Sequence, residues 1–219
     1  MRKTAFALFA HPDDESFGPG GTIALLAKTH EVYLICATKG EAGQDFSKTL
    51  EPLPIKRERE VLQAAKILGI KKVYFLGHID GKIDNSIYHA IAKQIEDLAQ
   101  IHKPEVFITY ENRGISGHLD HIAISMITSS VYYRLDYVKE LHYFCIDESQ
   151  RGAGQTYFVY FPPGYSNNEI TRRVDISPVL DQKINAIKSH VSQIEDVKVM
   201  LERHKEKRVE ECFIILKKK

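Results

Sequence analysis

The chain has 219 residues and a mass of 25.0 kDa, the usual size of one domain. Its 30 Lys and Arg residues and 29 Asp and Glu residues give a net charge of +1, which excludes a nucleic-acid binder that relies on bulk positive charge. Hydrophobic residues make up 43% of the chain and charged residues 27%, and these proportions exclude a largely disordered protein.

Short apolar runs alternate with helix-like runs through the first 133 residues. Strands are predicted at residues 4–10, 31–38, 72–76 and 106–110, and helices at 22–29, 55–68, 86–101 and 118–133. Nearly continuous apolar strands that alternate with helices are typical of a parallel sheet covered on both faces. We therefore predict a Rossmann-like α/β fold, a mostly parallel sheet flanked by helices, in one domain over residues 1–219.

The alternation is weaker after residue 138. Here the sequence predicts strands at 141–146, 156–161 and 212–216, a turn at Pro162-Pro163-Gly164, and helices at 178–190 and 191–207. The segment 1–10 is interpreted as a buried strand rather than a signal peptide, because His, Pro and acidic residues follow it directly. No apolar run approaches the ~20 residues of a membrane span.

The number and spacing of the three cysteines indicate the cellular compartment. Cys36, Cys145 and Cys212 are odd in number and widely spaced, and no CxxC motif occurs. A disulfide framework and a cysteine zinc site are therefore not expected. Free thiols are typical of the cytoplasm, where we expect this protein.

The first chemical cluster is His11-Pro12-Asp13-Asp14-Glu15, directly after the first predicted strand. In open α/β sheets, sites form beyond the carboxyl ends of the strands. Three carboxylates within five residues repel one another, and a bound cation would relieve that repulsion. His and Asp are suitable zinc ligands. The alternative is an acidic helix N-terminus stabilised by the helix dipole.

The second cluster is Gly117-His118-Leu119-Asp120-His121, after the fourth predicted strand. His118 and His121 are three residues apart and therefore share one helical face. Asp120 can accept a hydrogen bond from an imidazole ring and determine its tautomer. The alternative is a pair of surface histidines without a chemical role.

The two clusters are expected at the same edge of the sheet, because both follow parallel strands. Together they offer His11, Asp14 and one of the distal histidines. Two histidines and one carboxylate leave coordination positions open for water, as in hydrolytic zinc sites. Asp13 is then available as a general base beside the metal.

At this point the chain resembles the zinc-dependent de-N-acetylases of the PIG-L/LmbE type over nearly its whole length. The resemblance is carried by five segments: residues 10–22 around the first cluster, 36–43, 57–69, 117–121, and 189–193 with the sequence Ser-His-Val-Ser-Gln. It implies an LmbE-like fold with zinc held by His11, Asp14 and His121. It further implies a general base at Asp13, and His118 polarising or protonating the tetrahedral intermediate with Asp120 behind it.

Two further residues are candidates for binding the substrate. Arg57 could contact substrate oxygens, with an ion pair to Glu60 or Glu41 as the alternative. The family's Pro-Asp-Gly appears here as Ile79-Asp80-Gly81, so Asp80 is a candidate for sugar hydroxyls. His190 is interpreted as a packing residue or as support for a ligand.

The sequence thus predicts a zinc-dependent hydrolase that removes an N-acetyl group from an amino sugar of the N-acetylglucosamine type, a small-molecule substrate. One alternative is an amidase that cleaves a larger sugar or thiol conjugate at the same metal. Another is a non-catalytic zinc- or sugar-binding module, and the intact Asp13 argues against it. The oligomeric state stays open, a homo-oligomer included.

Overall fold

The computed structural model describes residues 2–47, 49–150, 159–205 and 209–218. Within these residues lies a seven-stranded sheet with the order β3-β2-β1-β4-β5-β7-β6. Its strands are β1 (Lys3–Phe9), β2 (His30–Cys36), β3 (Lys72–Phe75), β4 (Val106–Tyr110), β5 (Glu140–Cys145), β6 (Arg172–Asp175) and β7 (Glu210–Lys217). The strands from β3 to β5 pair in parallel, whereas β7 pairs antiparallel with both β5 and β6. The predicted mostly parallel sheet is confirmed.

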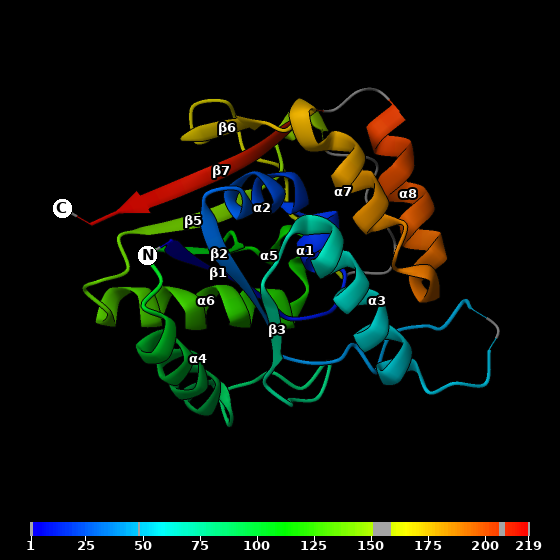
Figure 1. Cartoon of the computed structure of the whole chain (residues 1–219), viewed down its shortest axis with the longest axis horizontal. Helices are drawn as coiled ribbons and strands as arrows, with labels where there is room; N and C mark the ends of the chain where they lie inside the picture. Colours follow the sequence, from blue (N-terminus) through cyan, green and yellow to red (C-terminus); the bar gives the residue numbers. More distant parts are fainter. Residues whose placement is uncertain (1, 48, 151–158, 206–208, 219) are drawn as a thin grey trace.

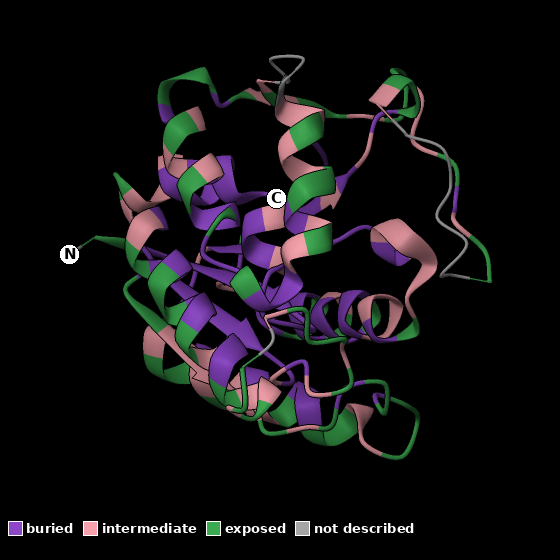
Figure 2. Cartoon of the chain, turned by 90° about the vertical axis from the view of Figure 1, so that its right-hand side faces the viewer, coloured by how far each residue is buried: buried purple, intermediate pink, exposed green. Residues whose placement is uncertain are grey.

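Helices cover both faces of this sheet, as expected for a Rossmann-like fold. They are α1 (Asp14–Phe17), α2 (Gly20–Ala27), α3 (Leu53–Leu68), α4 (Tyr88–His102), α5 (Gly114–Gly117), α6 (Leu119–Arg134), α7 (Leu180–Ile187) and α8 (Ile194–Lys205). Figure 1 shows α4 and α6 along one face, with α2, α3, α7 and α8 on the other. Buried residues fill the middle of the molecule, and exposed residues lie on the outer sides of the helices (Figure 2).

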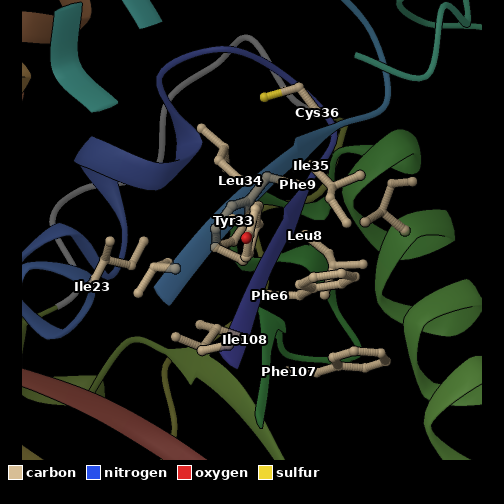
Figure 3. Close-up of a cluster of buried hydrophobic side chains, with 14 of the residues drawn as sticks. Phe6, Leu8, Phe9, Ile23, Tyr33, Leu34, Ile35, Cys36, Phe107 and Ile108 are labelled. Atoms are coloured by element: carbon tan, nitrogen blue, oxygen red, sulfur yellow. The ribbon is translucent and has the colours of Figure 1, made fainter. Parts of the chain in front are cut away.

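The central strand β1 is buried on both faces, because successive side chains of a strand point to opposite sides. Phe6 and Leu8 lie on the side of α4 and α6 together with Phe107 (Figure 3). Leu34 lies on the opposite side, where Ile23 of α2 packs (Figure 3). This two-sided burial explains why the strand reads as a continuous apolar run in the sequence.

The C-terminal third departs most from the sequence prediction. The strand β6 is not predicted, because its sequence Arg-Arg-Val-Asp is polar and it lies at the edge of the sheet. Of the strand expected at 156–161, residues 156–158 lie outside the described residues and 159–161 are not in a strand. The helix expected at 191–207 begins at Ile194, after a single 3₁₀ turn over Val191–Gln193, and residues 206–208 are not described. Among the described helices, none has the length and apolar character needed to cross a membrane.

The order of the strands determines where a site can form. The chain runs outward from β1 to β2 and β3 on one side, and continues from β4 to β5 on the other. The order therefore reverses between β1 and β4, which lie side by side in parallel. In open α/β sheets ligands bind beyond the carboxyl ends of the strands at such a reversal. Both sequence clusters follow these two strands.

Candidate metal centre

The loop after β1 brings His11 and Asp14 to the carboxyl end of the sheet. The backbone N–H of His11 donates to Asp14 Oδ2 at 2.8 Å, so the two residues are held together locally. Tyr110, the last residue of β4, donates its hydroxyl to the same oxygen of Asp14. The ring of Tyr110 also stacks on His121, with 4.1 Å between the ring centres. Tyr110 therefore orients two of the predicted ligands, a role that its position at the end of an apolar strand did not reveal.

The loop after β4 delivers the distal histidines. His118 is the N-cap of α6, and its Nδ1 accepts the backbone N–H of Asp120 at 3.1 Å. A neutral ring that accepts through Nδ1 carries its proton on Nε2. Burial lowers the pKa of His118, which favours this neutral form. His118 is therefore prepared to donate a hydrogen bond from Nε2.

Ligand atoms of three residues converge where the two loops meet: one nitrogen from each histidine and both oxygens of Asp14. His11 Nδ1 lies 3.1 Å from His121 Nε2 and 3.6 Å from Asp14 Oδ2, and His121 Nε2 lies 3.3 Å from Asp14 Oδ1. Zinc bonds of ~2.0–2.1 Å in tetrahedral geometry put ligand atoms about 3.3 Å apart. The predicted set His11, Asp14 and His121 therefore has the spacing that a zinc ion requires.

Hydrogen bonds behind the two imidazoles determine which nitrogens are available to a metal. His11 Nε2 lies 2.8 Å from Asp80 Oδ1, and His121 Nδ1 lies 3.1 Å from the carbonyl oxygen of Gly114. These nitrogens carry protons, which leaves His11 Nδ1 and His121 Nε2 as the two nitrogens that can offer a lone pair to a metal. A second group, His11 with Asp80 and His118, also has ligand atoms close together. The hydrogen bond from His11 Nε2 to Asp80 argues against a metal at this second group, because that nitrogen already donates its proton to the carboxylate.

The charges around His11 favour a cation. Burial lowers the pKa of His11, but hydrogen bonds to Asp120 and Asp80 and the charge of Asp14 outweigh it and raise that pKa to about 10. Burial lowers the pKa of His121 to about 4. Without a metal, the group thus takes up a proton on one imidazole and keeps the other neutral. A bound dication supplies the positive charge that these carboxylates require.

Asp13 lies beside this group in a strained conformation. Its φ of 108° is unusual for a residue other than glycine. Its backbone N–H donates to Glu15 Oε2 at 3.0 Å, which holds this turn. Arg57 donates to Asp13 Oδ2 at 2.8 Å and also to the carbonyl oxygens of Pro12 and Gly40. Burial raises the pKa of Asp13 to about 7, although the charge of Arg57 opposes this rise.

Several predicted residues have partners that the sequence did not indicate. Arg57 pairs with Asp13, whereas Glu60 and Glu41, the alternative partners considered for it, accept the backbone N–H groups of Ser192 and Asp80. Both carboxylate oxygens of Asp80 accept hydrogen bonds: Oδ1 from His11 Nε2, and Oδ2 from the backbone N–H of Ala42 at 3.2 Å.

Asp120 and His190 support the site from behind. The carboxylate of Asp120 accepts the backbone N–H of Gly81 at 2.7 Å and lies 3.4 Å from His11 Nε2. It therefore lies behind His11, whereas its own backbone N–H contacts His118. His190 is fully buried, with Nε2 3.0 Å from Glu15 Oε1, which fits its interpretation as a supporting residue.

A cavity of about 560 Å³ includes the metal-capable group. Its wall includes aromatic side chains from distant parts of the chain, namely Phe17, Phe46, Tyr110, Phe144 and Phe161. Aromatic faces pack well against the apolar faces of sugar rings. The sequence motifs contain only one of these residues, Phe17, so the sequence did not indicate an aromatic binding surface.

Comparison with known proteins identifies the class. Residues 6–132 match the family described as PIG-L, GlcNAc-PI de-N-acetylase. The chain belongs to this family.

The relatives are named as sugar deacetylases. A probable N-acetyl-alpha-D-glucosaminyl L-malate deacetylase 2 from Bacillus cereus is 30% identical over 89% of this chain and 86% of that protein. A 1D-myo-inositol 2-acetamido-2-deoxy-alpha-D-glucopyranoside deacetylase from Mycobacteroides abscessus is 28% identical over 84% of this chain and 79% of its own length. The structure of N,N'-diacetylchitobiose deacetylase from Pyrococcus horikoshii shares the fold, with a TM-score of 0.73, 20% identity, and coverage of 99% of this chain and 84% of that one.

Proposed function

We propose that residues 1–219 form a single deacetylase domain that uses zinc to remove an N-acetyl group from an N-acetylglucosamine-type sugar. The observation that carries this proposal is the convergence of His11 Nδ1, Asp14 and His121 Nε2 at 3.1–3.6 Å, with Asp13 lining the same cavity. Family membership and the names of the relatives support the class of reaction. The buried free thiols support a cytoplasmic location.

The residues around the cavity have distinct chemical roles in this proposal. When bound, zinc acts as a Lewis acid toward the amide carbonyl and lowers the pKa of a water molecule. Asp13 takes the proton of that water, and because Arg57 holds Oδ2, we assign this step to Oδ1. The proton then passes to the amine nitrogen, by way of Asp13 or His118, as the C–N bond breaks and acetate and the free amino sugar leave. His118 donates from Nε2 to the oxyanion that develops on the substrate. Tyr110 keeps Asp14 and His121 in position throughout.

The test is acetate release by the purified protein from N-acetylglucosamine and from its malate and inositol conjugates. Activity is expected to disappear with a zinc chelator and to return when zinc is added. Replacing Asp13 by Asn is the matched control, because it should retain zinc but lose most of the turnover. Hydrolysis of a glucosamine conjugate that carries a larger N-acyl group, without acetate release from the N-acetyl substrates, would favour the alternative amidase. Zinc binding without any hydrolysis across the panel would favour a non-catalytic binding module.

A further inference from the structure

Glu111 directly follows β4 and is buried, with 3% of its surface exposed. Its Oε1 accepts the backbone N–H of Ile115 at 2.7 Å. Its Oε2 accepts the backbone N–H of Arg113 at 2.7 Å and the hydroxyl of Tyr165 at 2.6 Å. One carboxylate therefore holds two backbone amides of the same short loop and a side chain from a distant segment. None of the roles assigned above uses this residue.

The loop that Glu111 holds has an unusual backbone. Gly114 and Gly117 have φ values of +67° and +78°, which glycine tolerates. Ile115 between them has φ 64° and ψ −60°, close to the classic γ-turn, which is rare and strained. For a β-branched residue this conformation persists only when its surroundings enforce it. The bond from the Ile115 N–H to Glu111 is the contact that enforces it here.

This strained loop presents an acceptor to a predicted metal ligand. The carbonyl oxygen of Gly114 lies 3.1 Å from His121 Nδ1. A Cβ added to Gly114 would lie 2.9 Å from the Cβ of His121, so the loop packs closely against this residue. If Ile115 relaxed to an ordinary conformation, the Gly114 carbonyl would turn away from the ring. His121 would then lose the bond that keeps its Nε2 lone pair available for the metal.

We propose that Glu111 is a positioning residue for the metal centre. It holds Ile115 in its strained conformation, so that the Gly114 carbonyl fixes the tautomer and orientation of His121. This proposal rests on the zinc site proposed above. Glu111 would therefore support zinc binding without contacting zinc or substrate itself.

The same carboxylate also connects this loop to the segment around Tyr165. The guanidinium of Arg113 lies 3.8 Å from the ring centre of Tyr165, and Glu111 accepts the hydroxyl of that tyrosine. The backbone of Tyr165 is held separately, since its N–H donates to the carbonyl oxygen of Ile146. Removing the Tyr165 hydroxyl should therefore leave the Ile115 and Arg113 contacts of Glu111 in place.

The test is the zinc affinity of the metal-free protein, measured by competition with a chromophoric chelator. Glu111→Gln retains the size of the side chain but replaces one acceptor oxygen with an NH₂ group. Zinc affinity should fall about 10- to 100-fold, the usual effect of removing support from a metal ligand. Glu111→Asp keeps the charge on a shorter side chain and should cause a smaller loss of zinc affinity. This variant also provides the test if Glu111→Gln does not fold.

Three further variants separate positioning from general stabilisation. Ile115→Gly should restore most of the zinc affinity in the Glu111→Gln background, because glycine adopts a φ of 64° without strain. Glu60→Gln is the matched control: Glu60 is also buried and accepts one backbone N–H and one hydroxyl, both from Ser192, outside the metal centre. It should lower the melting temperature without changing zinc affinity, and Tyr165→Phe should also retain zinc affinity.

The outcomes distinguish this inference from the proposed function. Wild-type zinc affinity in both Glu111 variants would overturn the positioning role and leave the zinc site intact. A loss in Glu111→Gln that Ile115→Gly does not restore, or an equal loss in Glu60→Gln, would show that Glu111 only stabilises the fold. Failure of the wild-type protein itself to bind zinc would refute the metal site and this inference together.

Discussion

Replacing Asp80 by Asn tests whether this carboxylate supports the metal or binds the sugar. In the structure Asp80 Oδ1 lies 2.8 Å from His11 Nε2, and Oδ2 accepts the backbone N–H of Ala42. Asparagine has the same shape but no charge, and its NH₂ group cannot accept one of these two N–H groups. If Asp80 acts by holding His11, the substitution should therefore weaken zinc binding.

The size of this effect can be estimated from the two hydrogen bonds. A hydrogen bond to a charged group contributes about 1.5–3 kcal/mol and a neutral one about 0.5–1.5 kcal/mol, so losing the charge costs roughly 1–1.5 kcal/mol at His11. This corresponds to about a tenfold weaker zinc affinity, since 1.4 kcal/mol is a factor of ten. The unsatisfied contact with Ala42 increases the loss, within the 10- to 100-fold range of residues that support metal ligands.

The assay combines a zinc competition titration with steady-state acetate release at saturating zinc. We expect a tenfold or greater loss of zinc affinity and a kcat/KM that largely recovers when zinc is saturating. Asp84→Asn is the matched control, because Asp84 is an exposed loop residue that bonds to Ser86. A raised KM with unchanged zinc affinity would refute this reasoning and assign Asp80 to the sugar hydroxyls, as the sequence predicted.

Four further predictions concern the site and its substrate. His11→Ala and His121→Ala should each abolish tight zinc binding, because each removes one of the three protein ligands; full zinc occupancy in both purified variants would refute the assignment. Asp13→Asn should retain zinc and lose about 10²–10⁴-fold in kcat, whereas loss of the metal would mean that the two aspartates have exchanged roles. His118→Ala should lower kcat with zinc still bound, and an unchanged kcat would remove it from the oxyanion step. In a substrate panel, mono- and disaccharide N-acetyl derivatives should be deacetylated faster than polymeric chitin, because the cavity of about 560 Å³ is suited to small sugars; preference for the polymer would refute this.

The sequence by itself determined the class of fold and pointed to the residues proposed as metal ligands. The runs that became β1, β2 and β4 are readable because strands buried on both faces are apolar along most of their length. The five-residue cluster His11 to Glu15 is readable because adjacent carboxylates are costly without a cation. The edge strand β6 is not readable in this way, since its polar residues satisfy no periodicity.

Only the tertiary structure decided how the site residues are used. Arg57 and Asp13 lie 44 positions apart in the sequence, and so their ion pair depends on how α3 packs beside the loop after β1. The tautomer of His121 is determined by the Gly114 carbonyl, through a backbone conformation at Ile115 that residue preferences oppose. Such contacts arise from the three-dimensional meeting of separate segments. Local sequence therefore indicates which groups are available for the chemistry, whereas the packing of the loops decides which nitrogen or oxygen of each group faces the proposed metal position.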